Sequence, residues 1–205
     1  MTASSIETSD TRAAIAAHVT RDLPELEDIR NRDLRAKVVE AWSYALAEEG
    51  LRRISDMEGC GSPGRLQLRT GSQLTHIRAV TNMARASGEA LKASDPDLPL
   101  DVDILIAGGL LHDVGKPFEF NAARRAGWTD RPSSCGFPAM RHPAHGWHIC
   151  LTVGLPIEVA HIAGAHSHEG EHLQRSLECI LVHHADFAYW KALKVSGLLI
   201  DPPLS

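Results

Sequence analysis

Residues 108–117, GGLLHDVGKP, constrain the fold more than any other stretch, because an apolar run ends there in an adjacent histidine and aspartate, His112 and Asp113. Neighbouring residues of a helix point about 100° apart, so the two side chains face different directions. Polar groups at the end of a core-facing run are costly to bury unless something satisfies them. The run therefore predicts a buried helix that ends at Pro117, and the fold has to bring partners to His112 and Asp113.

Apolar residues recur with helical spacing along most of the chain. A helix capped near Thr70 or Ser72 is expected to carry His76 on its inner side. No convincing alternation typical of strands is found, and residues 56–65, DMEGCGSPGR, are expected to form a loop because they are rich in Gly, Pro and Ser. The predicted fold class is all-α, with further helices at residues 32–54, 143–153, 156–165 and 173–194.

Residues 118–141 are rich in Gly, Pro and Arg and show little periodicity. A connection of this length favours a lid or substrate loop over an idle link. Within it, Trp128 and Phe137 fit either stacking on a base or ordinary hydrophobic anchoring of the loop.

The composition is that of an ordinary globular protein of 205 residues. We expect one compact unit, in which N-terminal helices within residues 1–60 pack on a domain of residues 61–205. A net charge of −5 gives no sign of a broad nucleic-acid surface. Four scattered cysteines without a CxxC pair favour a reducing compartment, and no signal or membrane span is recognised, so a cytoplasmic protein is expected. A homodimer is compatible with this organisation.

The most unusual feature of the composition is its twelve histidines, most of which lie from His142 to His184. Helices that converge on a bundle core can aim such side chains at one point. Imidazole and carboxylate together suit first-row divalent metals, and Asp113 is the residue best placed to bridge two ions. Six candidate ligands follow one another at intervals of about one helix and loop: His76, His112, Asp113, His142, His166 and Asp186.

This order resembles the HD superfamily of metal-dependent phosphohydrolases over residues 75–190. LLHDVGKP has the HDxGK form, RHPAHG is similar to an HPxxG segment, AHSHEG is similar to an AHH-type segment, and ILVHHADF supplies a closing aspartate. The resemblance implies an HD-domain helical bundle with a metal site in its core. It also implies one or two divalent transition-metal ions among Fe, Mn, Ni, Co and Zn, with Fe or Mn favoured.

The resemblance further implies how the ligands are shared between the metals. A first metal would be held by His76, His112, Asp113 and Asp186, and a second by Asp113, His142 and His166. His168, followed by Glu169, is an alternative to His166. The Gly-Tyr-Pro motif of cyclic-di-nucleotide enzymes is missing, which argues against that activity.

Other residues receive expected roles in catalysis and substrate binding. Asp113 would orient the nucleophile, and Lys116 would either bind substrate phosphate or complement a helix dipole. His145 or His148 would protonate the leaving group, although both also fit a surface or supporting role. The candidates for binding the substrate anion are Lys116, Arg141, Arg69 and Arg124.

The function expected from the resemblance is hydrolysis of a phosphomonoester or phosphodiester of a nucleotide or another small phosphorylated metabolite by a metal-activated water. An alternative is a mixed-valent di-iron oxygenase, because some members of the superfamily use the same six ligands for that chemistry. A third reading is a degenerate module for nucleotide sensing or protein contact, which the complete ligand set disfavours.

Overall fold

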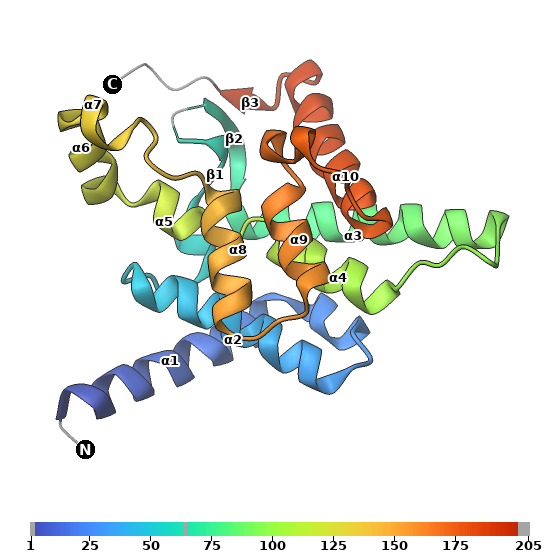
Figure 1. The fold of residues 1–205 in the computed structure, drawn as a ribbon, viewed down its shortest axis with the longest axis horizontal. Helices are drawn as coiled ribbons and strands as arrows, with labels where there is room; N and C mark the ends of the chain where they lie inside the picture. The colour runs from blue at the N-terminus through green and yellow to red at the C-terminus, as the bar shows by residue number, and fades with distance from the viewer. Residues whose placement is uncertain (1–2, 64, 201–205) are drawn as a thin grey trace.

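The computed structural model describes residues 3–63 and 65–200 and confirms a predominantly helical fold (Figure 1). Three short 3₁₀ helices, η1 (Pro24–Asp28), η2 (Ile54–Asp56) and η3 (His168–His172), interrupt the connections. The α-helices of the described part are α1 (Ala3–Asp22), α2 (Arg32–Glu48), α3 (Gln73–Ser94), α4 (Val102–Leu111), α5 (Lys116–Phe120), α6 (Ala122–Asp130), α7 (Pro132–Cys135), α8 (His142–Thr152), α9 (Ile157–Ala165) and α10 (Leu177–Val195).

Helix α4 lies at the centre of the bundle and packs against α2, α3, α9 and α10. Apart from Asp103 in the first turn its residues are apolar, and residues 105–111 are all buried. The side chain of Asp101 caps its N-terminus by accepting a hydrogen bond from the Ile104 amide. At the other end, the indole of the buried Trp42 in α2 donates to the Leu110 carbonyl oxygen at 2.9 Å. Both ends of α4 are thus fixed, and the segment that follows it starts from a rigid point.

A three-stranded antiparallel sheet corrects the expectation that the chain has no strands. Strand β1 (Glu58–Ser62) pairs with β2 (Arg65–Ser72), which pairs with the short β3 (Leu199–Ile200). The prediction of a loop over residues 56–65 was therefore wrong. Because β2 leads directly into α3, whose N-cap is Ser72 as predicted, the hairpin lies against the helix that carries His76.

Other element boundaries also differ from those expected. Helix α4 ends at Leu111, before His112, and Pro117 lies in the first turn of α5 instead of terminating α4. Residues 118–141, expected to be a lid or substrate loop, contain most of α5 and all of α6 and α7. The expected helices at residues 32–54 and 173–194 were too long, since α2 ends at Glu48 and α10 begins at Leu177.

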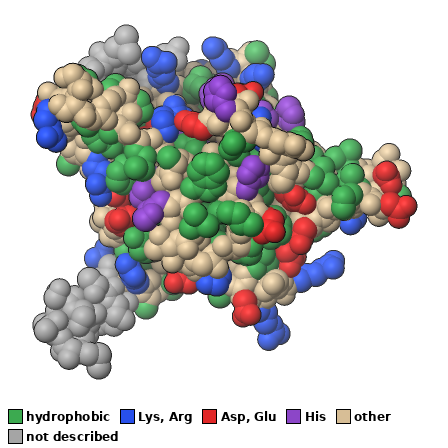
Figure 2. All heavy atoms as spheres, viewed as in Figure 1, with side chains coloured by type: hydrophobic (Ala, Val, Ile, Leu, Met, Phe, Trp, Pro, Cys, Tyr) green, Lys and Arg blue, Asp and Glu red, His purple; other side chains and the backbone are tan. Residues whose placement is uncertain are grey.

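One continuous hydrophobic core extends from α1 and α2 to α8 and α9. The boundary expected between the N-terminal helices and the domain of residues 61–205 falls inside β1. None of the described helices is long and apolar enough to cross a membrane. On the face shown in Figure 2, acidic and basic side chains are interspersed, and histidines reach the surface at several points.

Candidate metal centre

The fold brings all six predicted ligands together in two buried groups of three. His76 of α3, His112 after α4 and Asp186 of α10 form the first group. The second consists of Asp113, His142 at the start of α8 and His166 after α9. Within each group the potential ligand atoms lie within 4.8 Å of one another.

Asp113 lies between the two groups and turns one carboxylate oxygen towards each. Its Oδ2 is 3.1 Å from His76 Nε2 and 3.2 Å from His112 Nε2. Its Oδ1 is 3.3 Å from His142 Nε2 and 3.8 Å from His166 Nε2. This is the arrangement expected of a carboxylate that bridges two cations.

Hydrogen bonds on the outer side of three histidines orient their rings. His112 Nδ1 donates to the Gly109 carbonyl oxygen at 2.7 Å, and His166 Nδ1 donates to the Ala163 carbonyl oxygen at 3.0 Å. The buried Glu119 carboxylate accepts from both the backbone amide and Nδ1 of His142. Because these acceptors have no proton to give, Nδ1 carries a proton in each of the three rings, and Nε2 is the nitrogen that faces the cluster.

The electrostatics of the cluster also suit a cation. Burial alone would lower the pKa of His112, but Asp113 and Asp186 outweigh burial and raise it. Burial would raise the pKa of Asp113, but Lys116 and His112 hold this pKa well below its usual range. The buried Asp186 Oδ1 and His76 Nδ1 form no hydrogen bond among the described residues. Carboxylates that stay ionised beside inward-facing imidazole nitrogens fit a divalent transition metal.

The choice between His166 and His168 is resolved by their positions. His166 is buried in the second group, where burial lowers its pKa to about 3 and keeps its imidazole neutral. His168 is exposed and packs edge-on against Phe187, with 5.1 Å between ring centroids. His166 is therefore the candidate ligand, and His168 lies at the entrance to the site.

A cavity of about 300 Å³, named here the metal pocket, opens onto the cluster. It contains two of the predicted anion-binding residues, Lys116 and Arg141. Lys191 and Lys194 of α10, which were not predicted, add positive charge to its wall. The lining consists of Gly61, Ser62, Leu66, Asp113, Lys116, Arg141, His142, Ser167, His168, Asp186, Phe187, Trp190, Lys191 and Lys194.

Lys116 lies at the site, but its ammonium group is already engaged. Nζ is 2.8 Å from Asp113 Oδ2 and donates to the Cys60 carbonyl oxygen at 2.9 Å and to Gln73 Oε1 at 3.4 Å. An ammonium group has three N–H donors, and each has an acceptor here. Lys116 therefore holds Asp113 in place and ties it to β1.

Two predicted anion-binding residues lie elsewhere. Arg69 donates to the Gly197 carbonyl oxygen at 2.6 Å, which joins β2 to the end of α10. Arg124 forms an ion pair with Glu49 at 2.8 Å, and its guanidinium lies over the Phe118 ring. Neither lines the metal pocket.

The expected proton donors also lie away from the pocket. His145 is buried and stacks on Phe118, with 4.3 Å between ring centroids. Burial lowers its pKa to about 4, so the ring is neutral near pH 7. Exposed His148 neighbours it, and neither lines the metal pocket.

Two supporting residues were missed by sequence reasoning. Gln73 comes three residues before His76 on α3, and its side-chain amide donates to Asp113 Oδ2. The i, i+3 spacing from a predicted ligand is a signal that could have identified it. Glu119 carries no such signal, because its contact with His142 depends on how α5 packs against α8.

Comparisons with known proteins agree with this geometry. The sequence profile of the HD domain matches residues 74–187. The chain is also 28% identical over 177 residues to the dihydroneopterin 2',3'-cyclic phosphate phosphodiesterase of Methanocaldococcus jannaschii, an alignment that covers 79% of this chain and 65% of that protein. No solved structure matches the chain significantly. The profile extends from the helix carrying His76 to the residue after Asp186, and it includes all six candidate ligands that the fold brings together. This chain therefore belongs to the HD domain family.

Proposed function

We propose that this protein is a metal-dependent phosphoric ester hydrolase that cleaves a phosphodiester or phosphomonoester of a small anionic metabolite or nucleotide. The observation that carries the proposal is the position of Asp113, whose two oxygens face two separate histidine groups at the base of a pocket lined with basic residues. The similarity to a phosphodiesterase supports this class of reaction and favours a diester.

Divalent ions bound at the two groups would supply a water of lowered pKa and positive charge against the phosphoryl oxygens. The protein's own residues then have separate tasks. Asp113 joins the two groups, while Lys116 and Gln73 fix its orientation. Arg141, Lys191 and Lys194 bind the phosphate oxygens and stabilise negative charge as it develops.

The leaving alkoxide needs a proton, and His168 is the histidine best placed to give it. His168 lines the metal pocket but belongs to neither ligand group. Histidine is the most frequent general acid in enzymes that work near neutral pH. We assign this role to His168 in preference to His145, which faces Glu48 and Phe118.

The test compares purified wild-type protein with His112→Ala and with His172→Ala, which removes an exposed histidine outside the site. Metal content is measured by elemental analysis, and turnover of bis(p-nitrophenyl) phosphate and p-nitrophenyl phosphate is measured with Mn²⁺ or Fe²⁺. We expect His112→Ala to lose metal and at least about a hundredfold in turnover, because a ligand is gone, and His172→Ala to behave as wild type.

Full turnover by His112→Ala would refute the assignment of the metal site. Iron-dependent consumption of O2 without hydrolysis of either ester would replace the proposal with a di-iron oxygenase. Wild-type protein that binds no metal would support a sensing or contact module instead.

A further inference from the structure

A second cavity of about 330 Å³ adjoins the metal pocket and, apart from Glu119 and Arg141, is lined by residues with no part in the chemistry described above. We name it the arginine pocket. The hairpin, α5, α6 and the segment that precedes α8 all contribute to it. Its lining consists of Ser62, Pro63, Arg65, Glu119, Arg125, Trp128, Phe137, Pro138 and Arg141.

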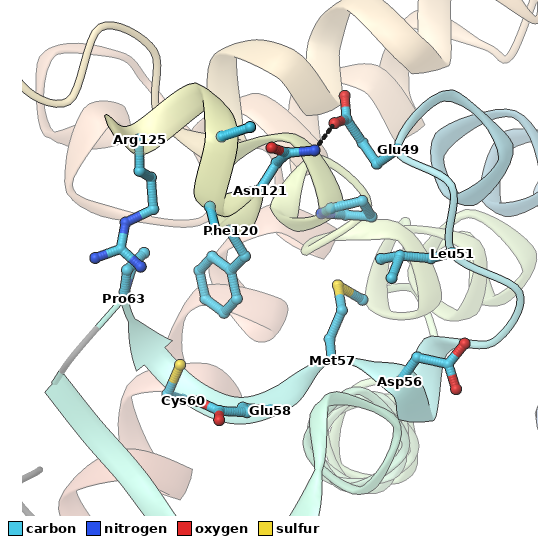
Figure 3. Close-up of a pocket in the computed structure, with 13 residues that line it drawn as sticks. Glu49, Leu51, Asp56, Met57, Glu58, Cys60, Pro63, Phe120, Asn121 and Arg125 are labelled. Atoms are coloured by element: carbon cyan, nitrogen blue, oxygen red, sulfur yellow. Dashed lines mark hydrogen bonds between the residues drawn. The ribbon is translucent and has the colours of Figure 1, made fainter. Parts of the chain in front are cut away.

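The charge of the arginine pocket is positive and largely uncompensated. Its single lining carboxylate, Glu119, bonds to His142 and lies 3.3 Å from Arg141 Nε. Among the described residues, Arg65 and Arg125 take part in no ion pair, whereas Arg141 faces both Glu119 and Glu169. Figure 3 draws a neighbouring cavity that Arg125 and Pro63 also line, and it shows the Arg125 side chain extending from α6 towards Pro63, which follows β1. Two guanidinium groups are thus free to bind an anion, and their planar fork suits phosphate or carboxylate.

The aromatic side chains of the pocket are presented in an unusual way. Phe137 is 60% exposed. Trp128 is half-buried, with 5.9 Å between the centroids of its ring and the Phe118 ring. Leaving a large apolar ring in water forgoes the stabilisation that burial would give. A planar heterocycle stacked against these rings would bury them and restore that stabilisation. Stacking of this kind is strong for nucleobases and accepts any base.

The two pockets form a continuous route for one ligand. Both are lined by Ser62 of the hairpin and by Arg141, the N-cap residue of α8. A phosphoester held at the metal pocket could therefore extend past Arg141 into the arginine pocket. Each cavity is at the lower end of the size range of small-molecule sites, which fits one part of a larger ligand.

We propose that the arginine pocket binds a planar heterocycle together with a second anionic group of the same substrate. The preferred substrates are then phosphoesters of a heterocycle that carries a further negative charge, as in a nucleoside bisphosphate. Arg65 and Arg125 bind the second anion, and Trp128 and Phe137 stack on the ring. This inference rests on the proposed function for the identity of the reacting group, but binding tests it separately from turnover.

The experiment measures dissociation constants by calorimetry for adenosine 3',5'-bisphosphate and for adenosine 5'-monophosphate. The proteins are wild type, Arg125→Met, Trp128→Ala and the control Arg131→Met, which changes an exposed arginine outside the pocket. We expect wild type to bind the bisphosphate at least tenfold more tightly than the monophosphate. Arg125→Met should abolish this preference, Trp128→Ala should weaken both nucleotides about tenfold, and Arg131→Met should match wild type.

Equal binding of the two nucleotides by wild type, or an unchanged preference in Arg125→Met, would overturn the proposal. Turnover of bis(p-nitrophenyl) phosphate by wild type separates this result from the proposed function, because that ester carries no second anion. A protein that cleaves it without preferring the bisphosphate keeps the hydrolase assignment and loses the arginine pocket. A protein that prefers the bisphosphate without hydrolysing any ester keeps the pocket and loses the hydrolase assignment.

Discussion

At the scale of single residues, the orientation of the candidate ligands depends on groups that are not themselves candidate ligands. His112 and His166 are oriented by carbonyl oxygens three residues earlier in the chain, so each histidine and its helix end form one local unit. His142 is different, because its partner Glu119 comes from another helix. The second group of candidate ligands is therefore the more sensitive of the two to substitution of a neighbouring side chain.

Replacing Glu119 tests this dependence. Glu119→Gln removes the carboxylate that fixes the Nδ1 proton of His142, and we expect the affinity of the second metal to fall about 10–100-fold. The first metal should bind as before, since His76, His112 and Asp186 are unchanged. Calorimetric titration of Mn²⁺ measures both affinities. Glu171→Gln, at an exposed glutamate paired with Arg175, is the control, and two unaltered affinities in Glu119→Gln would contradict the orienting role.

His145 predicts a pH dependence of stability. Burial lowers its folded-state pKa to about 4, below the ordinary value of 6.5. As the pH falls, the unfolded chain takes up this proton first, so the stability that the neutral ring contributes above pH 6.5 is lost between 6.5 and 4. Between pH 7 and pH 5, wild type should therefore lose about 2 kcal/mol more free energy of unfolding than His145→Gln.

Urea denaturation at the two pH values measures this difference, with His172→Gln as the control, because His172 is exposed and has no part in lowering the pKa of His145. If wild type and His145→Gln lose the same free energy of unfolding, the pKa of His145 is not lowered.

At the scale of elements, α4 holds the site because its neighbours approach it closely. A Cβ added at Gly108 would collide with the Ile162 side chain of α9, and one added at Gly115 would collide with the backbone of His142. Glycine at these positions lets α9 and the start of α8 come near enough to place His166 and His142 beside Asp113. The apolar run with two glycines in the sequence is thus a packing surface as well as a buried helix.

The packing of α4 on α9 can be measured with a matched pair of substitutions. Gly108→Ala should lower the free energy of unfolding by about 1–3 kcal/mol, because the added methyl overpacks the contact with Ile162. Gly127→Ala, on α6 with open space around the position, should instead leave stability unchanged or raise it by up to about 1 kcal/mol. Urea denaturation of both variants provides the comparison. A Gly108→Ala protein as stable as Gly127→Ala would show that Ile162 can move to accommodate the added methyl group without loss of stability.

The hairpin is the element that sequence patterns missed. Its strands contain five glycines or serines and few β-branched residues, so they show no alternation of apolar and polar positions. What stabilises them is pairing across the hairpin, pairing of β2 with the distant β3, and contact with α3. The pairing of β2 with β3 joins residues far apart in sequence, and no local pattern reports it.

At the scale of the whole molecule, the candidate ligands come from five regions of the bundle, at α3, the end of α4, the start of α8, the end of α9, and α10. Bound metal would hold these segments together in the folded state, whereas the unfolded chain has no such site. Metal binding and global stability should therefore be linked.

Removing metal tests that link. At a free metal concentration of a hundred times Kd, binding stabilises the fold by about 2.7 kcal/mol. Chelation should then lower Tm by roughly 5–10 °C for a chain of this size, and adding Mn²⁺ or Fe²⁺ back should restore it. Differential scanning calorimetry before and after chelation measures the change. A Tm that responds to neither treatment would mean that the six side chains hold no metal in the folded protein.

The side chains that can bind metal, and their order along the chain, were predictable from the sequence, because ligand chemistry belongs to the residue and helical spacing is a local property. The sequence identified all six members of the two groups. The packing of the folded chain was needed to distinguish His166 from His168 and to show that Lys116 is engaged with Asp113 and Cys60. It also places Arg69, Arg124 and His145 away from the site. Each of these outcomes depends on which distant segment packs beside the residue, and the energy of such long-range contacts cannot be inferred from any single stretch of the sequence.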